Sequence, residues 1–327
     1  MEVMSRAQRL VSIAAASMLF AAVPSPAPAQ AYPTKPVRLL VGFPPGGGTD
    51  TMARVLAQRF TAYWGQAVVV DNRPGADASI AMEAVAKSAP DGYTLYVVQP
   101  GIAINPALYK SVPFDPIKDF APISLIGEVP NIVATHPSLP ARTIQELVAL
   151  AKKNKGQLFY GTSSSPTMLA TEMLITMAGI HIVRVAYKGA APSITALISG
   201  EVQVLLSGVG NLLPLAKAGK MRALAVTGAK RSSLAPEIPT VSESGVPGYV
   251  AATWYGVTAP GSTPRGIIDR VNSDVRKALA EPEVKARLFD VGIAEPKPTT
   301  PDQFAEMIRA EIAKWAKVVK DAGVKIE

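Results

Sequence analysis

Short apolar runs alternate with longer amphipathic segments through most of the chain. In its first part, residues 37–42, 67–71 and 94–98 have the pattern of strands, while residues near 49–64 and 79–87 carry apolar positions at helical spacing. Regular alternation of strand and helix is typical of an α/β fold, in which helices cover both faces of a mostly parallel sheet. The first part of the chain therefore predicts one such sheet.

The same pattern starts again near Asn131 and predicts a second sheet. Strands are expected at residues 132–135, 158–160, 182–186, 202–206 and 223–227, and helices at 143–154, 167–177 and 192–198. The last part of the chain predicts a strand at 254–259 and helices at 264–280, 282–291 and 300–322.

The first residues have the layout of a secretory signal peptide. Arg6 and Arg9 precede an apolar stretch at residues 10–23, and small residues follow at Ala29 and Ala31. The apolar stretch is shorter than the about 20 residues of a membrane span. We expect residues 1–31 to be a cleaved signal peptide, with an uncleaved N-terminal anchor as the alternative.

Composition narrows the classes of function. Hydrophobic residues make up 48% of the chain and there is no Cys, which excludes disulfides, thiol catalysis and thiolate metal sites. The net charge of +8 either attracts anionic ligands or serves solubility. Scattered Lys and Arg with few aromatic residues argue against nucleic-acid binding. Two isolated His make a weak metal site, so neither a metal nor a cofactor is expected.

A glycine-rich loop at residues 42–50 follows the first predicted strand. Glycines between a strand and a helix let backbone N–H groups turn toward one point, and the helix directs its positive dipole end there. A carboxylate fits such a site without Lys or Arg. The loop lacks the Gly-x-x-x-x-Gly-Lys pattern of a phosphate loop and the Gly-x-Gly-x-x-Gly dinucleotide pattern. The alternative is a tight turn with Asp50 as an ordinary helix cap.

Residues 160–167 repeat this arrangement in the second part of the chain. Ser163, Ser164 and Ser165 follow a predicted strand, and Pro166 suits a helix start. The hydroxyl and N–H groups are candidates for gripping a second face of an anion, with capping by one Ser as the alternative. The segment lacks the final Gly of a nucleophile elbow, so a secreted serine hydrolase is only a remote alternative and no enzyme is expected.

These residues, with others along the chain, resemble the tripartite tricarboxylate transporter substrate-binding proteins, also called Bug receptors. The resemblance covers nearly all of residues 32–327. Its markers are the loop at 43–50 and the segments 32–33, 65–66, 71–76, 90–95, 105–109, 115–120, 187–189, 218–227, 239–248 and 259–264.

The resemblance implies a type II periplasmic binding protein fold with two lobes joined by crossover strands. Lobe 1 would combine residues 32–130 and 254–327, and lobe 2 would be residues 131–253. A ligand carboxylate would be held between the lobes. The implied ligand-binding residues are Phe43, Pro44, Gly46, Gly47 and Asp50 in lobe 1, and Ser163, Ser164, Ser165, Tyr187, Lys188 and Gly189 in lobe 2.

The chain departs from the family pattern in loops expected to face the ligand. Asp77 and Ala78 stand where Gly-Gly is usual, and Ser207 and Gly208 replace a frequent Asp-Asn pair. Asp77 is therefore a candidate for selecting a ligand amine or hydroxyl, with helix capping near Ser79 as the alternative. Ser207 is included in the predicted site, and the lost polar groups there hint at a less polar distal end of the ligand.

The resemblance also implies a role and partners. The expected protein is a periplasmic, monomeric receptor for a small carboxylate, which is a di- or tricarboxylate, an acidic amino acid or an aromatic acid. It would deliver that ligand to the membrane components of a tripartite transporter. A ligand-sensing receptor for a membrane signalling system is the alternative.

Overall fold

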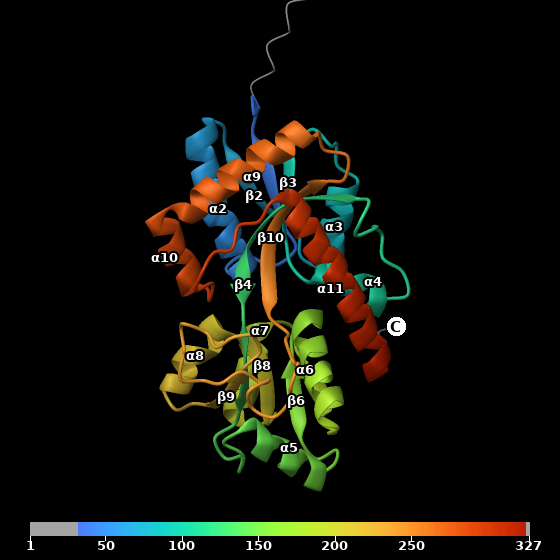
Figure 1. Cartoon of the computed structure of the whole chain (residues 1–327), viewed down its shortest axis with the longest axis vertical. Coiled ribbons are helices and arrows are strands. Elements are labelled where there is room, and N and C mark those ends of the chain that lie inside the picture. The colour runs from blue at the N-terminus through green and yellow to red at the C-terminus, as the bar shows by residue number, and fades with distance from the viewer. Residues whose placement is uncertain (1–31, 325–327) are drawn as a thin grey trace, which may run out of the picture. The chain divides into compact units, whose positions relative to one another are not determined.

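The computed structural model describes residues 32–324. The predicted signal peptide, residues 1–31, lies outside the described residues, as do residues 325–327. In the described part, the strands form two sheets of five strands each (Figure 1).

The first sheet has the strand order β2-β1-β3-β10-β4. Its strands are β1 (Val37–Val41), β2 (Val68–Asn72), β3 (Thr94–Val98), β4 (Phe120–Val129) and β10 (Thr253–Pro260). β1 pairs in parallel with β2 and β3, while β10 runs antiparallel to β3 and β4. The loops after β1, β2 and β3 therefore all start at the carboxyl ends of these parallel strands, where α/β proteins commonly bind ligands.

The second sheet repeats this topology in the order β7-β6-β8-β5-β9. Its strands are β5 (Asn131–Thr135), β6 (Phe159–Thr162), β7 (Val183–Ala186), β8 (Val204–Gly208) and β9 (Arg222–Val226). β6 pairs in parallel with β7 and β8, and β5 runs antiparallel to β8 and β9. In each sheet four strands therefore run in one direction and one strand, β10 or β5, runs against them, so the sheets are mostly parallel, as the sequence predicted, with one antiparallel strand each.

Helices connect the strands of both sheets. They are α2 (Gly48–Trp64), α3 (Ser79–Ala86), α4 (Gly101–Leu108), α5 (Ile144–Lys153), α6 (Ser165–Ala178), α7 (Ala190–Ser199), α8 (Val209–Lys217), α9 (Arg265–Ala280), α10 (Pro282–Asp290) and α11 (Pro301–Ala322), with a short 3₁₀ turn, η2 (Ala76–Ala78). None of these helices is both long and apolar enough to cross a bilayer.

The chain passes between the two sheets twice. β4 of the first sheet leads through Pro130 directly into β5 of the second. After β9, residues 227–252 lead back to β10 of the first sheet. The described residues from Lys35 onward form one compact unit. The expected boundaries of two lobes, near residues 130 and 253, stay a prediction.

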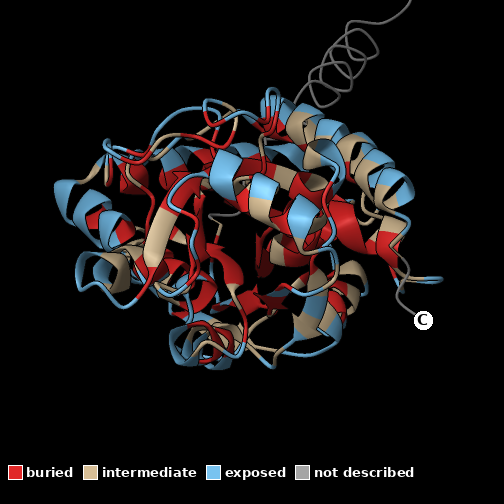
Figure 2. Ribbon diagram, turned by 90° about the horizontal axis from the view of Figure 1, so that it is seen from below, coloured by how far each residue is buried: buried red, intermediate tan, exposed pale blue. Residues whose placement is uncertain are grey.

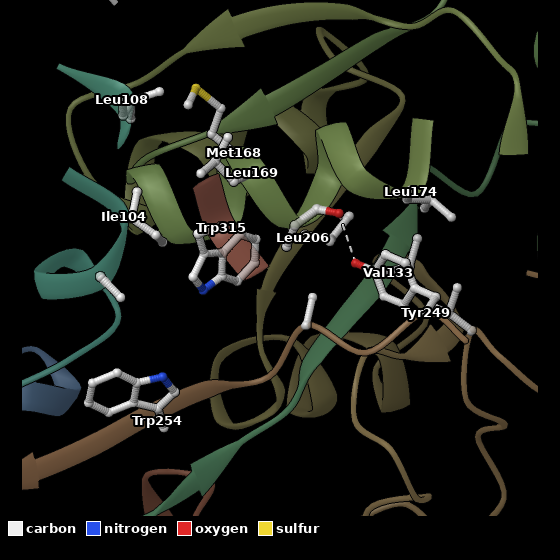
Figure 3. Packing of buried hydrophobic residues seen from close by; sticks show 14 of the residues in the cluster. Ile104, Leu108, Val133, Met168, Leu169, Leu174, Leu206, Tyr249, Trp254 and Trp315 are labelled. Atoms are coloured by element: carbon white, nitrogen blue, oxygen red, sulfur yellow. Dashed lines mark hydrogen bonds between the residues drawn. The ribbon is translucent and has the colours of Figure 1, made fainter. Parts of the chain in front are cut away.

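Buried residues follow the strands and the inner faces of the helices, and exposed residues lie on the outer helix faces (Figure 2). One hydrophobic cluster contains residues from both sheets, among them Leu125 of β4 and Val133 of β5. Trp315 of α11 belongs to the same cluster as Ile104 of α4 and Leu169 of α6 (Figure 3). Helices α4, α6 and α11 contact one another, so apolar packing connects the start of α6 with the first sheet.

Three elements were missed by the sequence pattern: α4, α8 and the crossover strand β4. Each contains a proline, a residue that usually interrupts helices and strands: Pro106 in α4, Pro214 in α8 and Pro122 in β4. β4 is an edge strand whose sole neighbour in the sheet is β10. An edge strand tolerates Pro because the lost N–H is not needed by a second neighbour.

Candidate functional site

The loop between β1 and α2 is held by the Asp50 carboxylate. Asp50 is 2% exposed, and its Oδ2 accepts hydrogen bonds from Gly46 N at 2.9 Å and from Arg54 Nε at 2.8 Å. Asn72 Nδ2 donates to Asp50 Oδ1 and to the Phe43 carbonyl oxygen, both at 3.0 Å. Asp50 therefore connects the loop to its own helix and to the end of β2.

The pKa of Asp50 reflects these partners. Burial raises the pKa of the carboxyl, but hydrogen bonds from Arg54, Gly46 and Asn72 outweigh burial and hold the pKa below its ordinary value of 3.8. Asp50 is thus ionised at neutral pH and serves to order the loop. Its predicted direct contact with a ligand stays a prediction.

The glycines of this loop shape its exposed part. Gly46 has φ +86°, a left-handed conformation that favours glycine. Gly47 is the N-cap of α2 with an ordinary φ of −82° and no side-chain cap. The first N–H groups of a helix lack acceptors within the helix. Gly46, Gly47 and Pro44 are exposed, and half-buried Phe43 packs against the hydrophobic core.

A strained turn lies beside the end of β1. Ala76, Asp77 and Ala78 all have positive φ, at 46°, 51° and 69°. Such conformations cost a non-glycine residue about 1–2 kcal/mol each and persist only where the surroundings enforce them. A Cβ on Gly42 would lie 2.4 Å from the Ala78 Cβ. Gly42 therefore lets the turn approach the end of β1, where the glycine-rich loop begins.

Asp77 connects this turn to the start of α6 in the second sheet. Its Oδ2 accepts hydrogen bonds from the hydroxyl of Ser165 and, at 3.3 Å, from the backbone N of Ser165. Asn105, which is fully buried, donates from Nδ2 to the Asp77 carbonyl oxygen at 3.0 Å and to Ser79 Oγ at 3.1 Å. The turn, α4 and α6 thus meet in one polar cluster.

Burial raises the pKa of Asp77, and the two hydrogen bonds from Ser165 offset part of that rise. The charge of Asp77 also acts on its neighbours. Burial and the nearby Asp77 carboxylate raise the pKa values of Tyr96 and Tyr109. Asp77 therefore lies in a poorly solvated environment, although part of the residue remains accessible to solvent.

The three serines at the start of α6 have different surroundings. Ser164 is the N-cap, and its hydroxyl shares a 3.1 Å hydrogen bond with Thr167 Oγ1. Ser165, 5% exposed, uses its hydroxyl for Asp77. Ser163 is partly exposed just before the helix. The alternative to an anion site was capping of the helix by a serine side chain. The Ser164 hydroxyl does not accept a hydrogen bond from the N–H groups at the helix start.

The remaining predicted residues follow β7 and β8. The Tyr187 hydroxyl donates a hydrogen bond to Glu201 Oε1 at 2.7 Å. Burial, together with this hydrogen bond, raises the pKa of Tyr187 to about 12. Lys188 is exposed, and Gly189 begins α7 with φ +111°. Ser207 is buried near the end of β8. The segment 187–189 thus follows β7, Ser207 lies within β8, and the contact of these residues with a ligand stays a prediction.

The two histidines were considered as metal ligands. His136 Nδ1 forms a hydrogen bond with Ser138 Oγ at 2.7 Å and lies in a surface turn. Among residues 32–324, no group of three or more His, Asp or Glu side chains could hold a metal ion.

Several residues that build the site were not predicted as site residues. Asn72 and Asn105 were missed because they contact loops distant in sequence. Arg54 and Thr167 were also missed, although each contacts a residue one turn away at the start of its own helix. Asn72 and Asn105 belong to segments that carry the family resemblance, which was the available signal. Tyr255 of β10 forms a hydrogen bond with Thr49, and burial raises its pKa to about 12. No signal in the sequence pointed to this residue.

Comparison with known proteins decides the family. The sequence model of the tripartite tricarboxylate transporter family receptors matches residues 52–324. This chain belongs to that family. The resemblance seen in its sequence is thereby confirmed, as is the expectation of a binding protein and not an enzyme.

Close relatives of this receptor align along almost their whole length. Protein BugT of Bordetella pertussis is 36% identical over 323 residues, which cover 98% of this chain and 99% of BugT. The solved structure of R. palustris Rpa4515 with adipate is 39% identical, with a TM-score of 0.83 over 90% of this chain and 100% of that chain. MatC from Rhodopseudomonas palustris with bound malate is 30% identical, with a TM-score of 0.78 over 88% and 100%. These neighbours confirm the predicted periplasmic binding protein fold.

Proposed function

We propose that this receptor captures a small organic carboxylate in the periplasm and delivers it to the membrane components of a tripartite transporter. The ligand classes in view are di- and tricarboxylates, acidic amino acids and aromatic acids. The family match supports the receptor role. The bound adipate and malate named for two relatives support the ligand chemistry.

One observation carries the proposal: two strand-to-helix loops, one from each sheet, flank the same turn. The loop before α2 starts at Gly42, which touches Ala78. The start of α6 contacts the same turn through Ser165 and Asp77. Helix starts are favourable places for anions because their N–H groups and dipoles point outward. The α2 loop can hold an anion by main-chain donors, and the start of α6 lies on the other side of the same turn, where Ser165 contacts Asp77.

The surroundings of the α2 loop are preorganised for such contacts. Asp50 and Asn72 fix the loop before any ligand binds, so less conformational entropy is lost on binding. Half-buried Phe43, which packs against the hydrophobic core, anchors the loop next to the exposed glycines. Closure of the protein around the ligand would exclude water and strengthen the hydrogen bonds.

Thermal-shift and calorimetric titrations with adipate, malate, glutamate and benzoate test the ligand class. An acid present at 100 times its Kd should stabilise the protein by about 2.7 kcal/mol. Absence of stabilisation by every acid in a broad panel, at concentrations far above micromolar, would contradict the proposal.

The variant Gly47→Ala tests the position of the ligand. Gly47 has an ordinary φ, and an added Cβ would meet only the Pro44 carbonyl oxygen, at 3.8 Å. We expect a loss of stability below about 1 kcal/mol, because Ala is a poorer N-cap than Gly, and a loss of affinity of about ten-fold, because the methyl group would narrow the approach to the helix start. Gly266→Ala, where an added Cβ meets nothing within 4 Å, is the matched control. Equal affinity in all three proteins would remove the α2 loop from the site.

Delivery to a transporter needs a cellular measurement. Deletion of the gene should abolish uptake of the radiolabelled ligand, and expression of the wild-type receptor should restore it. Normal uptake together with loss of a transcriptional response to the ligand would instead favour the sensing receptor.

A further inference from the structure

Asp77 places a carboxylate of the protein itself at the first residue of α6. Ser165 donates both its backbone N, at 3.3 Å, and its hydroxyl to the same oxygen, Asp77 Oδ2, and the hydroxyl also contacts Asn105 Oδ1 at 3.4 Å. A ligand carboxylate at the start of α6 would need these same donors. The position where the second sheet would grip an anion is therefore taken by a residue of the first.

The backbone holds Asp77 there. The turn around it is strained at three consecutive residues, and Asn105 anchors its carbonyl oxygen. Ala78 is 2% exposed and packs against Gly42. Because these constraints act on the main chain, the side chain stays directed at Ser165 without depending on a ligand.

The charge of Asp77 has no cationic partner nearby. Among the salt bridges of residues 32–324, none includes Asp77, and both hydrogen-bond donors to its carboxylate belong to Ser165. The titratable side chains that feel its charge are Tyr96 and Tyr109, which are neutral at physiological pH because their pKa values are raised further. A second carboxylate brought close to Asp77 would therefore be repelled without compensation.

We propose that Asp77 is a built-in anion that replaces one ligand carboxylate at the start of α6, so that this receptor selects acids with a single carboxylate over diacids. The proposal rests on the proposed function, since it assigns the ligand's one carboxylate to the α2 loop. The remainder of the ligand, next to Asp77, would be uncharged or would carry a hydroxyl or amine that donates to the free Oδ1. The relatives Rpa4515 and MatC have the diacids adipate and malate bound, so this selectivity would distinguish the chain from those two proteins.

Isothermal titration with matched acids tests this selection. The probes are adipate, hexanoate and 6-hydroxyhexanoate, which share one chain length and differ at one end. The proteins are wild type, Asp77→Asn, Asp77→Gly and the control Asp290→Asn, which removes a charge at the exposed end of α10. Asp77→Gly also removes the strain of a positive φ, so a folding defect in one variant does not disable the test.

Wild type should bind the two monocarboxylates at least about ten-fold more tightly than adipate. Both Asp77 variants should shift that ratio toward adipate by about ten-fold or more, while Asp290→Asn leaves it unchanged. An unchanged ratio in both Asp77 variants, or a wild-type preference for adipate, would overturn the role of Asp77 and leave the carboxylate receptor intact. If no protein binds any of a broad panel of acids, the proposed function fails as well.

Discussion

At the scale of single residues, the carboxylates of Asp50 and Asp77 have pKa values shifted in opposite directions. Asp50 receives hydrogen bonds from an arginine, an amide side chain and a backbone N–H, which hold its pKa below 3.8. Asp77 receives hydrogen bonds from one serine, and burial raises its pKa. The residue type is the same in both places, so the difference comes from the donors that the fold supplies.

This contrast predicts opposite pH dependences for two variants. A lowered pKa means that Asp50 stabilises the fold above pH 3.8 and that this stability is lost as the pH falls through the folded-state pKa. A raised pKa means that Asp77 binds a proton more tightly in the folded state than in the unfolded state. The stability of the fold therefore decreases as the pH rises from 3.8 through the folded-state pKa of Asp77.

Urea unfolding of wild type, Asp50→Asn and Asp77→Asn at about pH 7, 5 and 3.5 measures both effects. At neutral pH, Asp50→Asn should lose about 1.5–3 kcal/mol, the range for hydrogen bonds to a charged group, and its deficit should shrink in acid. For Asp77→Asn, stability relative to wild type should decrease as the pH falls. Parallel pH profiles for the three proteins would contradict the assignment.

At the scale of elements, the turn between β2 and α3 depends on close approach to two neighbours. Gly42 at the end of β1 leaves room for Ala78, and Gly101 at the start of α4 lies beside the Asp77 carbonyl oxygen. The two glycines differ in the space around them. An added Cβ would reach 2.4 Å from its nearest neighbour at Gly42 but only 3.7 Å at Gly101, which is an ordinary contact.

Gly42→Ala should therefore displace the turn, whereas Gly101→Ala should not. We expect Gly42→Ala to lower the free energy of unfolding by about 1–3 kcal/mol, as overpacking does. Because the shift would move Asp77 away from Ser165, ligand selectivity should change as well. Gly101→Ala serves as the control in both denaturation and titration. Equal stability of the two variants would show that the turn does not need the contact at Gly42.

At the scale of the whole molecule, the hydrophobic cluster joins both sheets. Trp254 of β10 and Trp315 of α11 are almost completely buried, and both donate their indole N–H to Glu311 Oε2, at 3.0 and 2.8 Å. Helix α11 contacts α4 and α6, and Figure 3 shows Trp315 together with side chains of both. The packing that supports the site is thus shared by the elements of both sheets.

Trp315→Ala tests this shared packing. Loss of a large buried aromatic side chain should lower the free energy of unfolding by about 3–5 kcal/mol. Since the cluster is continuous, circular dichroism and tryptophan fluorescence should report one coincident transition in wild type. The control Phe289→Ala, at a side chain 47% exposed, should cost far less. Two separated transitions in wild type would mean that the sheets unfold independently.

The pattern of the sequence predicted most strands and helices because hydrophobic periodicity is local. The expected strand at 94–98 and helix at 300–322 match β3 and α11 to within one residue. Elements interrupted by Pro, such as β4 with Pro122, were missed because their tolerance of Pro depends on neighbours in space.

By itself, the sequence determined the α/β class, the family and the glycine- and serine-rich loops, since these are written in local composition and spacing. Only the tertiary structure decided which of those loops meet. Asp77 and Ser165 are 88 residues apart, and no local pattern pairs them. Their contact follows from the approach of Ala78 to Gly42 and from the packing of α6 on α4, which are long-range contacts that depend on the whole fold.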